Sequence, residues 1–103
     1  MEIKEIMKFA EESQEKISKY YSKSKEELIP YHALKIGEEL GELLEQVLAH
    51  QNIQRKDKAI DKKQIGEEVA DVLLATLILA KSLNLDVESE IKRKIEKNKG
   101  RLN

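Results

Sequence analysis

The stretch IGEEVADVLLATLILA, residues 65–80, decides the fold of this chain of 103 residues. Between Val72 and Ala80 only Thr76 is polar, so a helix over this segment is apolar around its whole circumference. Such a helix must be buried on all sides. The rest of one chain is too short and too highly charged to enclose it. We therefore predict a helical bundle that is shared between the subunits of a homodimer or homotetramer.

The remainder of the chain also favours helices. Charged residues make up 38% of the sequence and aromatic residues 4%, with a single proline, a mixture that is typical of helices and poor for sheets. Apolar spacing predicts four helices, over residues 2–22, 30–50, 61–83 and 87–99, with a polar connector at 53–60. Asp61, paired with Gln64, and Asp86 are the expected N-caps of the last two. The expected fold is all-α, with residues 1–103 as one domain.

Charge and cysteine content exclude several classes of function. The formal net charge is -1, which gives no electrostatic reason to bind a nucleic-acid polymer or an anionic membrane. Cysteine is absent from the sequence, which excludes disulfides and thiolate metal sites. The N-terminal residues lack the apolar centre of a signal peptide, and the apolar run at 72–80 is too short to span a bilayer. We expect a cytoplasmic protein.

An acidic heptapeptide occurs twice, as IGEELGE at 36–42 and as IGEEVAD at 65–71. With the first isoleucine of each copy as origin and about 100° per residue, Glu39 and Glu42 lie roughly 60° and 120° from the centre of the apolar stripe. Glu68 and Asp71 take the same two angles on the next helix. Each helix therefore presents a pair of carboxylates on the same flank of its apolar face.

These four carboxylates converge if the two helices pack through their apolar stripes. Four anions beside a core repel one another and are costly to desolvate, and a divalent cation resolves that conflict. Ligands that are all oxygen favour Mg²⁺, or Mn²⁺, over Zn²⁺. The alternative is an acid-rich helix face that is simply solvated. A ferritin-like di-iron site is disfavoured, because the sequence contains no Glu-x-x-His motif.

With these residues in view, the segments GEELGE, EEVADVLLATLILAKSLNLD and KIEKNKGR resemble a MazG-like nucleotide pyrophosphohydrolase of the all-α NTP pyrophosphohydrolase superfamily. The resemblance covers about residues 31–101, and the family pattern EExxE followed by ExxD matches 38–42 and 68–71. It implies that Mg²⁺ is held by Glu39, Glu42, Glu68 and Asp71. It further implies that water attacks the α-phosphate of a nucleoside or deoxynucleoside triphosphate, giving a monophosphate and pyrophosphate.

The resemblance also implies cationic contacts to the substrate from the C-terminal segment. A KNxxR-like element maps onto Lys97, Asn98 and Arg101, with Lys94 one turn earlier, and would contact the phosphates or the sugar. The alternative is a solvated basic helix end that complements the helix dipole.

Three residues near the first heptapeptide have two interpretations each. Glu38 can accept a proton just outside the metal ligands, or it can be a solvated surface acid. Lys35 can pair with Glu39 within its helix or contact phosphate. His32 shares the flank of Glu39 and can touch the base or ribose, or it can have a structural role at the helix start.

Two alternative functions remain open. A phosphoribosyl-ATP pyrophosphohydrolase belongs to the same superfamily, and a non-catalytic helical oligomerisation or interaction module would explain the apolar helix without any chemistry. The preferred base is not determined, because the chain has no tryptophan and only four aromatic residues with which to hold one.

Overall fold

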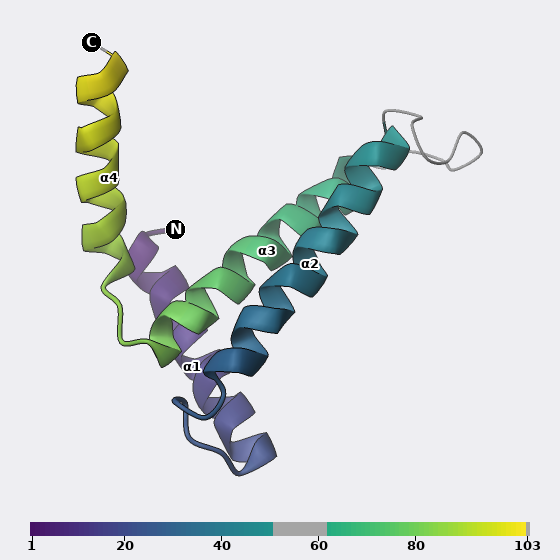
Figure 1. The fold of residues 1–103 in the computed structure, drawn as a ribbon, viewed down its shortest axis with the longest axis vertical. Coiled ribbons are helices and arrows are strands. Elements are labelled where there is room, and N and C mark those ends of the chain that lie inside the picture. Colours follow the sequence, from purple (N-terminus) through teal and green to yellow (C-terminus); the bar gives the residue numbers. More distant parts are fainter. Residues whose placement is uncertain (51–61, 103) are drawn as a thin grey trace.

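The computed structural model describes residues 1–50 and 62–102, and four helices account for most of them (Figure 1). Their bounds are α1 Ile3–Tyr21, α2 Ile29–His50, α3 Lys62–Ser82 and α4 Val87–Leu102. These described ranges contain no strand, which confirms the all-α class. The ends of α1, α2 and α3 agree with the sequence prediction to within one or two residues, whereas α4 continues three residues past 99. The predicted connector at 53–60 and the Asp61 cap lie outside the described residues.

The turn between α1 and α2 is built from local hydrogen bonds. Ser22 takes a left-handed conformation, with φ of 54°, and ends α1. A capping box follows, in which the Glu27 backbone N–H donates to Ser24 Oγ at 3.1 Å and the Ser24 N–H donates to Glu27 Oε1 at 3.0 Å. Because both donors are satisfied locally, the chain reverses within a few residues and delivers the start of α2 next to the end of α1.

The α3–α4 turn has the geometry of a Schellman motif. Asn84 is left-handed, with φ of 57°, and the Leu85 N–H donates to the Ala80 carbonyl at 3.0 Å. Asp86 then caps α4, since the Ser89 backbone N–H donates to its Oδ1 at 3.2 Å and the Ser89 hydroxyl to its Oδ2 at 2.8 Å. The sequence prediction of Asp86 as the cap of the last helix is confirmed. Lys25 Nζ donates to Asn84 Oδ1 and so ties the two turns together.

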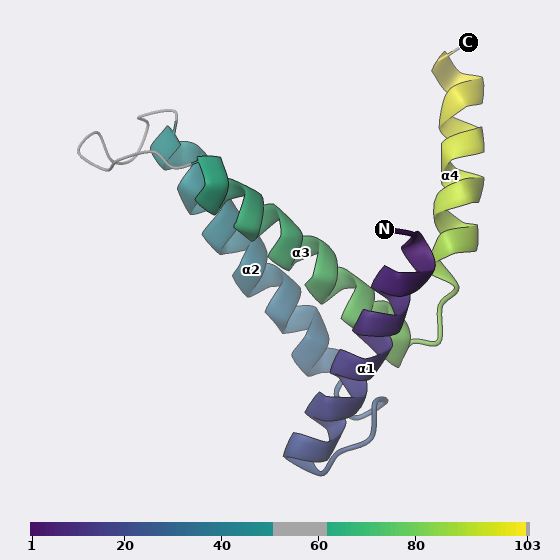
Figure 2. The same cartoon turned by 180° about the vertical axis from the view of Figure 1, so that it is seen from behind.

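Helices α2 and α3 lie side by side along their length, and α1 crosses the end of this pair where α2 begins and α3 ends (Figures 1 and 2). Helix α4 begins beside the N-terminal end of α1 and then extends away from the other three helices in both views. Every residue from 89 to 101 is exposed, including Ile91 and Ile95 on its apolar side. One chain therefore provides a three-helix body and a fourth helix that has almost nothing to pack against.

The core of this body is small. Among the described residues, Leu28 is the only large apolar side chain that is buried, and the other buried apolar residues are alanines. By contrast, Leu34 is 76% exposed and Leu73 is 60% exposed. The radius of gyration is 16.4 Å, whereas a compact domain of this length has one of about 13 Å. A single chain thus leaves the apolar face of α3 open, and the sharing of α3 between subunits stays a prediction.

Within the described ranges, none of the helices combines the length and apolar character needed to cross a membrane.

Candidate functional site

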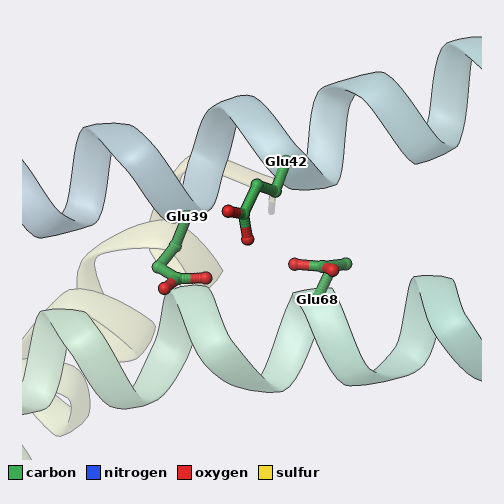
Figure 3. A group of neighbouring side chains, drawn as sticks. All are labelled: Glu39, Glu42 and Glu68. Carbon is green, nitrogen blue, oxygen red and sulfur yellow. The ribbon is translucent and has the colours of Figure 1, made fainter.

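Three of the four predicted metal ligands meet between α2 and α3. Glu39 and Glu42 extend from α2 and Glu68 from α3, and their carboxylates face a common space (Figure 3). One oxygen of each lies within 4.8 Å of the other two. Opposite ligands of Mg²⁺ are about 4 Å apart, so small side-chain rotations would bring these oxygens to one ion.

Two features make this cluster of carboxylates unfavourable in the absence of a cation. Burial raises the pKa of Glu39 above its ordinary value, and the nearby carboxylates of Glu42 and Asp71 raise it further. Glu68 Oε2 is buried and has no hydrogen-bond partner among the described residues. A buried, unpaired carboxylate oxygen is costly. An oxygen-seeking divalent cation would neutralise the cluster and satisfy that oxygen, so the residues present fit such an ion.

Asp71 lies at the margin of the cluster. Its carboxylate is not in the group of three, and its side chain is exposed. It is nevertheless close enough to raise the pKa of Glu39, and both residues line the same cavity. Asp71 is one turn beyond Glu68 on α3, which leaves it beside the space that the three glutamates face.

Lys35 and Glu38 pair with each other on the exposed side of α2. Lys35 Nζ lies 3.3 Å from Glu38 Oε1 and 3.8 Å from Glu39 Oε1. The predicted ion pair of Lys35 with Glu39 is therefore present. Glu38 is exposed and lies outside the carboxylate cluster.

His32 is only 2% exposed, and its Nε2 atom is buried without a hydrogen-bond partner among the described residues. Burial lowers its pKa. It lines a cavity of about 250 Å³ that also reaches Lys35, Glu39 and Asp71. The remaining lining comes from all three packed helices: Phe9, Ser13, Ile17, Tyr31, Leu74, Ala75 and Ile78.

The contribution of α1 to this cavity was missed in the sequence. Phe9, Ser13 and Ile17 follow one another at intervals of four residues and so share one flank of α1. Phe9 and Ser13 lie beside the main apolar stripe of that helix rather than within it. The four-residue spacing is the signal that could have identified this second face.

The predicted substrate contacts on α4 are not brought to the acids in one chain. All four residues of this set are exposed, on the helix that points away from the α2–α3 pair (Figure 1): Lys94, Lys97, Asn98 and Arg101.

A larger groove, of about 680 Å³, lies between α1 and the start of α4. Its lining carries lysines and acids in equal number, including the Lys81–Glu11 ion pair at 3.7 Å, and it contains none of the clustered glutamates.

Comparison with known proteins identifies the family of the segment that carries the carboxylate cluster. No curated protein and no solved structure matches the chain. A model of the MazG-like family matches residues 31–103, which include most of α2, all of α3 and α4, and every residue of the carboxylate cluster, while α1 lies outside the match. Since the match covers well over half of the sequence, the chain belongs to the MazG-like family.

Proposed function

We propose that this protein is a Mg²⁺-dependent nucleoside triphosphate pyrophosphohydrolase. The observation that supports this most is the meeting of Glu39, Glu42 and Glu68 between two helices, in a chain whose family points to the nucleotide pyrophosphohydrolase superfamily. In this proposal the three glutamates and Asp71 hold Mg²⁺, or Mn²⁺ in its place. When bound, the ion neutralises phosphate charge and activates water.

The protein's own groups have separate tasks in the reaction. In this proposal a carboxylate of the metal-binding group accepts the proton from the attacking water. Glu38 pairs with Lys35 and lies outside the carboxylate cluster, so the geometry favours a cluster carboxylate over Glu38 as the proton acceptor. Lys35, at the rim of the cavity, can turn from its ion pair towards phosphate.

We also propose that the working unit is a homodimer or homotetramer. The poorly filled core and the exposed Leu34 and Leu73 side chains support this, because burying them requires another chain. Helix α4 supports it independently. Its exposed Ile91 and Ile95 have no apolar surface to pack against in their own chain. Because α4 extends away from the α2–α3 pair, its Lys97 and Arg101 can approach a carboxylate cluster only on another copy of the chain.

The test is a panel of nucleoside and deoxynucleoside triphosphates incubated with Mg²⁺, with pyrophosphate and orthophosphate measured separately. We expect pyrophosphate and the monophosphate in equal amounts, with no orthophosphate. Phosphoribosyl-ATP is included, since hydrolysis of that compound alone would assign the other activity of the superfamily.

A non-catalytic helical interaction module is the second candidate, and the exposed leucines of α2 and α3 favour it. Under that function no member of the panel releases pyrophosphate, even from folded, oligomeric protein. The adjacent variants Glu68→Gln and Glu67→Gln separate the two candidates. Hydrolysis should be lost only in Glu68→Gln, because Glu67 is exposed and outside the cluster.

A further inference from the structure

Helix α4 has an apolar side with almost nothing to cover it among the described residues of its own chain. Ile91 is 43% exposed and Ile95 is 47% exposed. At about 100° per residue, the residues within roughly 40° of Ile91 form one continuous seam along the helix: Val87, Ile91, Ile95 and Asn98. A seam with this spacing of three or four residues is the pattern by which one helix packs along another.

The charges of α4 are separated along its length. Residues 86–90 carry three acidic side chains and no basic one, whereas residues 91–101 carry six basic side chains and one acidic one. Two such helices side by side in the same direction would bring like charges together, and in opposite directions the acidic start of each lies against the basic remainder of the other. Charge complementarity therefore selects an antiparallel helix of the same sequence, which a second copy of this chain provides.

We propose that, in the nucleotide-free protein, α4 pairs antiparallel with α4 of a second copy through this seam. A single register, centred between residues 93 and 94, satisfies both flanks. On one flank, about 60–80° from the seam, Glu88 lies opposite Lys99 of the second copy. On the other flank, about 100–120° from the seam, Glu90 lies opposite Lys97 of the second copy. Because the contact is isologous, each pair occurs twice.

The same register also closes the seam. Ile91 of one copy lies beside Ile95 of the other, so both isoleucines are withdrawn from water. Lys92 falls close to Glu96 of the second copy, which adds a further pair of opposite charges. Lys94 lies near its own equivalent at the twofold axis and is the like-charge contact of this register. Opposite-charge contacts therefore outnumber the unfavourable one.

Ion pairs within α4 do not prevent this change of partner. Glu90 pairs with Arg93 and Glu96 with Lys99 on their own helix, but all four side chains are more than half exposed. Such exposed pairs contribute little to stability, so breaking them costs little.

The pair of α4 helices is small, with two exposed isoleucines from each chain. It therefore adds to an oligomer that is held by α3, where the local concentration of α4 is high, and does not replace it. The inference goes beyond the proposed function and does not depend on hydrolysis. A bound triphosphate that draws Lys97 to its phosphates would compete with the pair, which is why the pair is assigned to the nucleotide-free protein.

Cross-linking tests the register directly, because the chain has no cysteine of its own. Glu88→Cys and Lys99→Cys are prepared as full chains, one of them isotopically labelled, and are refolded together and treated with a short bis-maleimide. We expect the mixture to form mixed cross-linked dimers, and neither variant to cross-link efficiently alone. The control is a mixture of Ser89→Cys and Gly100→Cys, at about 160° and 180° from Ile91, which should give little product.

Three results would overturn the inference. Efficient cross-linking of Glu88→Cys alone would indicate parallel helices. Equal yields from the two mixtures would indicate random collision. Absence of mixed dimers between Glu88→Cys and Lys99→Cys, in folded and oligomeric protein, would show that the two helices do not meet in this register.

Charge reversal supplies a second measurement. Glu90→Lys or Lys97→Glu, added to both cysteine variants, places like charges opposite each other and should abolish most of the mixed product. Both reversals in the same chain should restore it. Each reversal also opposes the helix dipole, a defect that the double reversal does not repair, so restoration is specific to the pairing. A double variant as low as the single ones would overturn the inference. Restored cross-linking in a protein that releases no pyrophosphate would uphold the pair and reject the hydrolase alone.

Discussion

Glu39 on α2 and Glu68 on α3 are 29 residues apart in the sequence, yet their carboxylates approach to within 4.8 Å. Two carboxylates this close repel each other, so helix packing or a bound cation must offset the repulsion. Here the approach coincides with a raised pKa for Glu39 and a buried, unpartnered oxygen on Glu68. The metal-free cluster is therefore a source of local instability that a divalent ion would relieve.

Removing one charge from the cluster should stabilise the metal-free protein. We expect Glu42→Gln to raise the free energy of unfolding by roughly 0.2–0.5 kcal/mol, the usual scale of like-charge repulsion one turn apart on a helix. The measurement is chemical denaturation in EDTA at one fixed protein concentration. Glu67→Gln, on the exposed face of α3, should change stability by less. A lower stability for Glu42→Gln would mean that Glu42 makes a favourable contact in the absence of metal.

Stability should fall as the solution is acidified below the ordinary pKa of histidine, about 6.5. Burial lowers the pKa of His32 in the folded state, so below that value the unfolded chain takes up a proton that the folded chain resists. Thermal denaturation from pH 8 to pH 5.5 measures the effect. His32→Asn should flatten the curve, because it removes the imidazole whose pKa burial lowers.

The carboxyl groups that stabilise turns act in a different pH window. The pKa values of Glu27 and Asp86 are lowered by hydrogen bonds from Ser24 and Ser89 respectively, so their contributions are lost only at more acidic pH. An equal loss of stability between pH 8 and pH 5.5 in wild type and His32→Asn would contradict the assignment to His32.

Asp86→Ala should reduce the helicity of α4. The side chain accepts hydrogen bonds from the backbone N–H and hydroxyl of Ser89, and loss of an N-cap costs about 1 kcal/mol. Because α4 packs against little else in its chain, the loss should appear as faster amide exchange in residues 87–101 rather than as global unfolding. Asp86→Asn, which keeps an accepting oxygen, should retain most of the protection. Equal exchange in all three proteins would show that the cap contributes nothing.

A charge on the open face of α3 should break the oligomer. Leu73 is 60% exposed in one chain, on the most apolar helix, and Leu73→Asp would place a carboxylate in the predicted interface. Light scattering after size exclusion should find a dimer or tetramer for wild type and a monomer for the variant. Tyr20→Asp, at an exposed site on α1, should leave the oligomer intact. A monomeric wild type at micromolar concentration would contradict the prediction.

Mixing two impaired proteins tests whether α4 serves the acids of another copy. Glu68→Gln lacks a cluster carboxylate, and Arg101→Ala lacks a cation on α4. If each site combines the acids of one chain with α4 of another, a randomly exchanged dimer mixture recovers about a quarter of wild-type activity. If each chain uses its own α4, mixing recovers nothing beyond the sum of the two variants.

The repeated heptapeptide predicted which carboxylates lie on the facing flanks of the two helices, because helical geometry alone determines those angles. The matched angles of Glu39, Glu42 and Glu68 placed them on facing flanks, and packing of α2 against α3 brings them together. Asp71 has an equivalent angle but lies outside the group of three. How closely a side chain approaches the facing helix is set by packing between the helices and not by the periodicity of either one.

The parts that the sequence did not predict depend on contacts between distant elements. The resemblance to the family implied phosphate contacts for Lys97 and Arg101, but the direction of α4 is set at the Asn84 turn, and α4 extends away from the carboxylate cluster of its own chain. His32 is likewise buried close to α1, whose Phe9, Ser13 and Ile17 line the same cavity. Neither arrangement leaves a periodic signal in the residues concerned.

Titration of the protein with Mn²⁺, followed by electron paramagnetic resonance with and without a non-hydrolysable nucleoside triphosphate analogue, tests the central claim most directly. Wild type and Glu67→Gln should bind the ion with the same affinity. Glu68→Gln should bind it at least about tenfold more weakly, because mutating even the residues that hydrogen-bond to metal ligands lowers metal affinity by that factor. Equal affinity in all three proteins, or no binding by folded wild type under either condition, would contradict the assignment of Glu39, Glu42 and Glu68 as a metal centre.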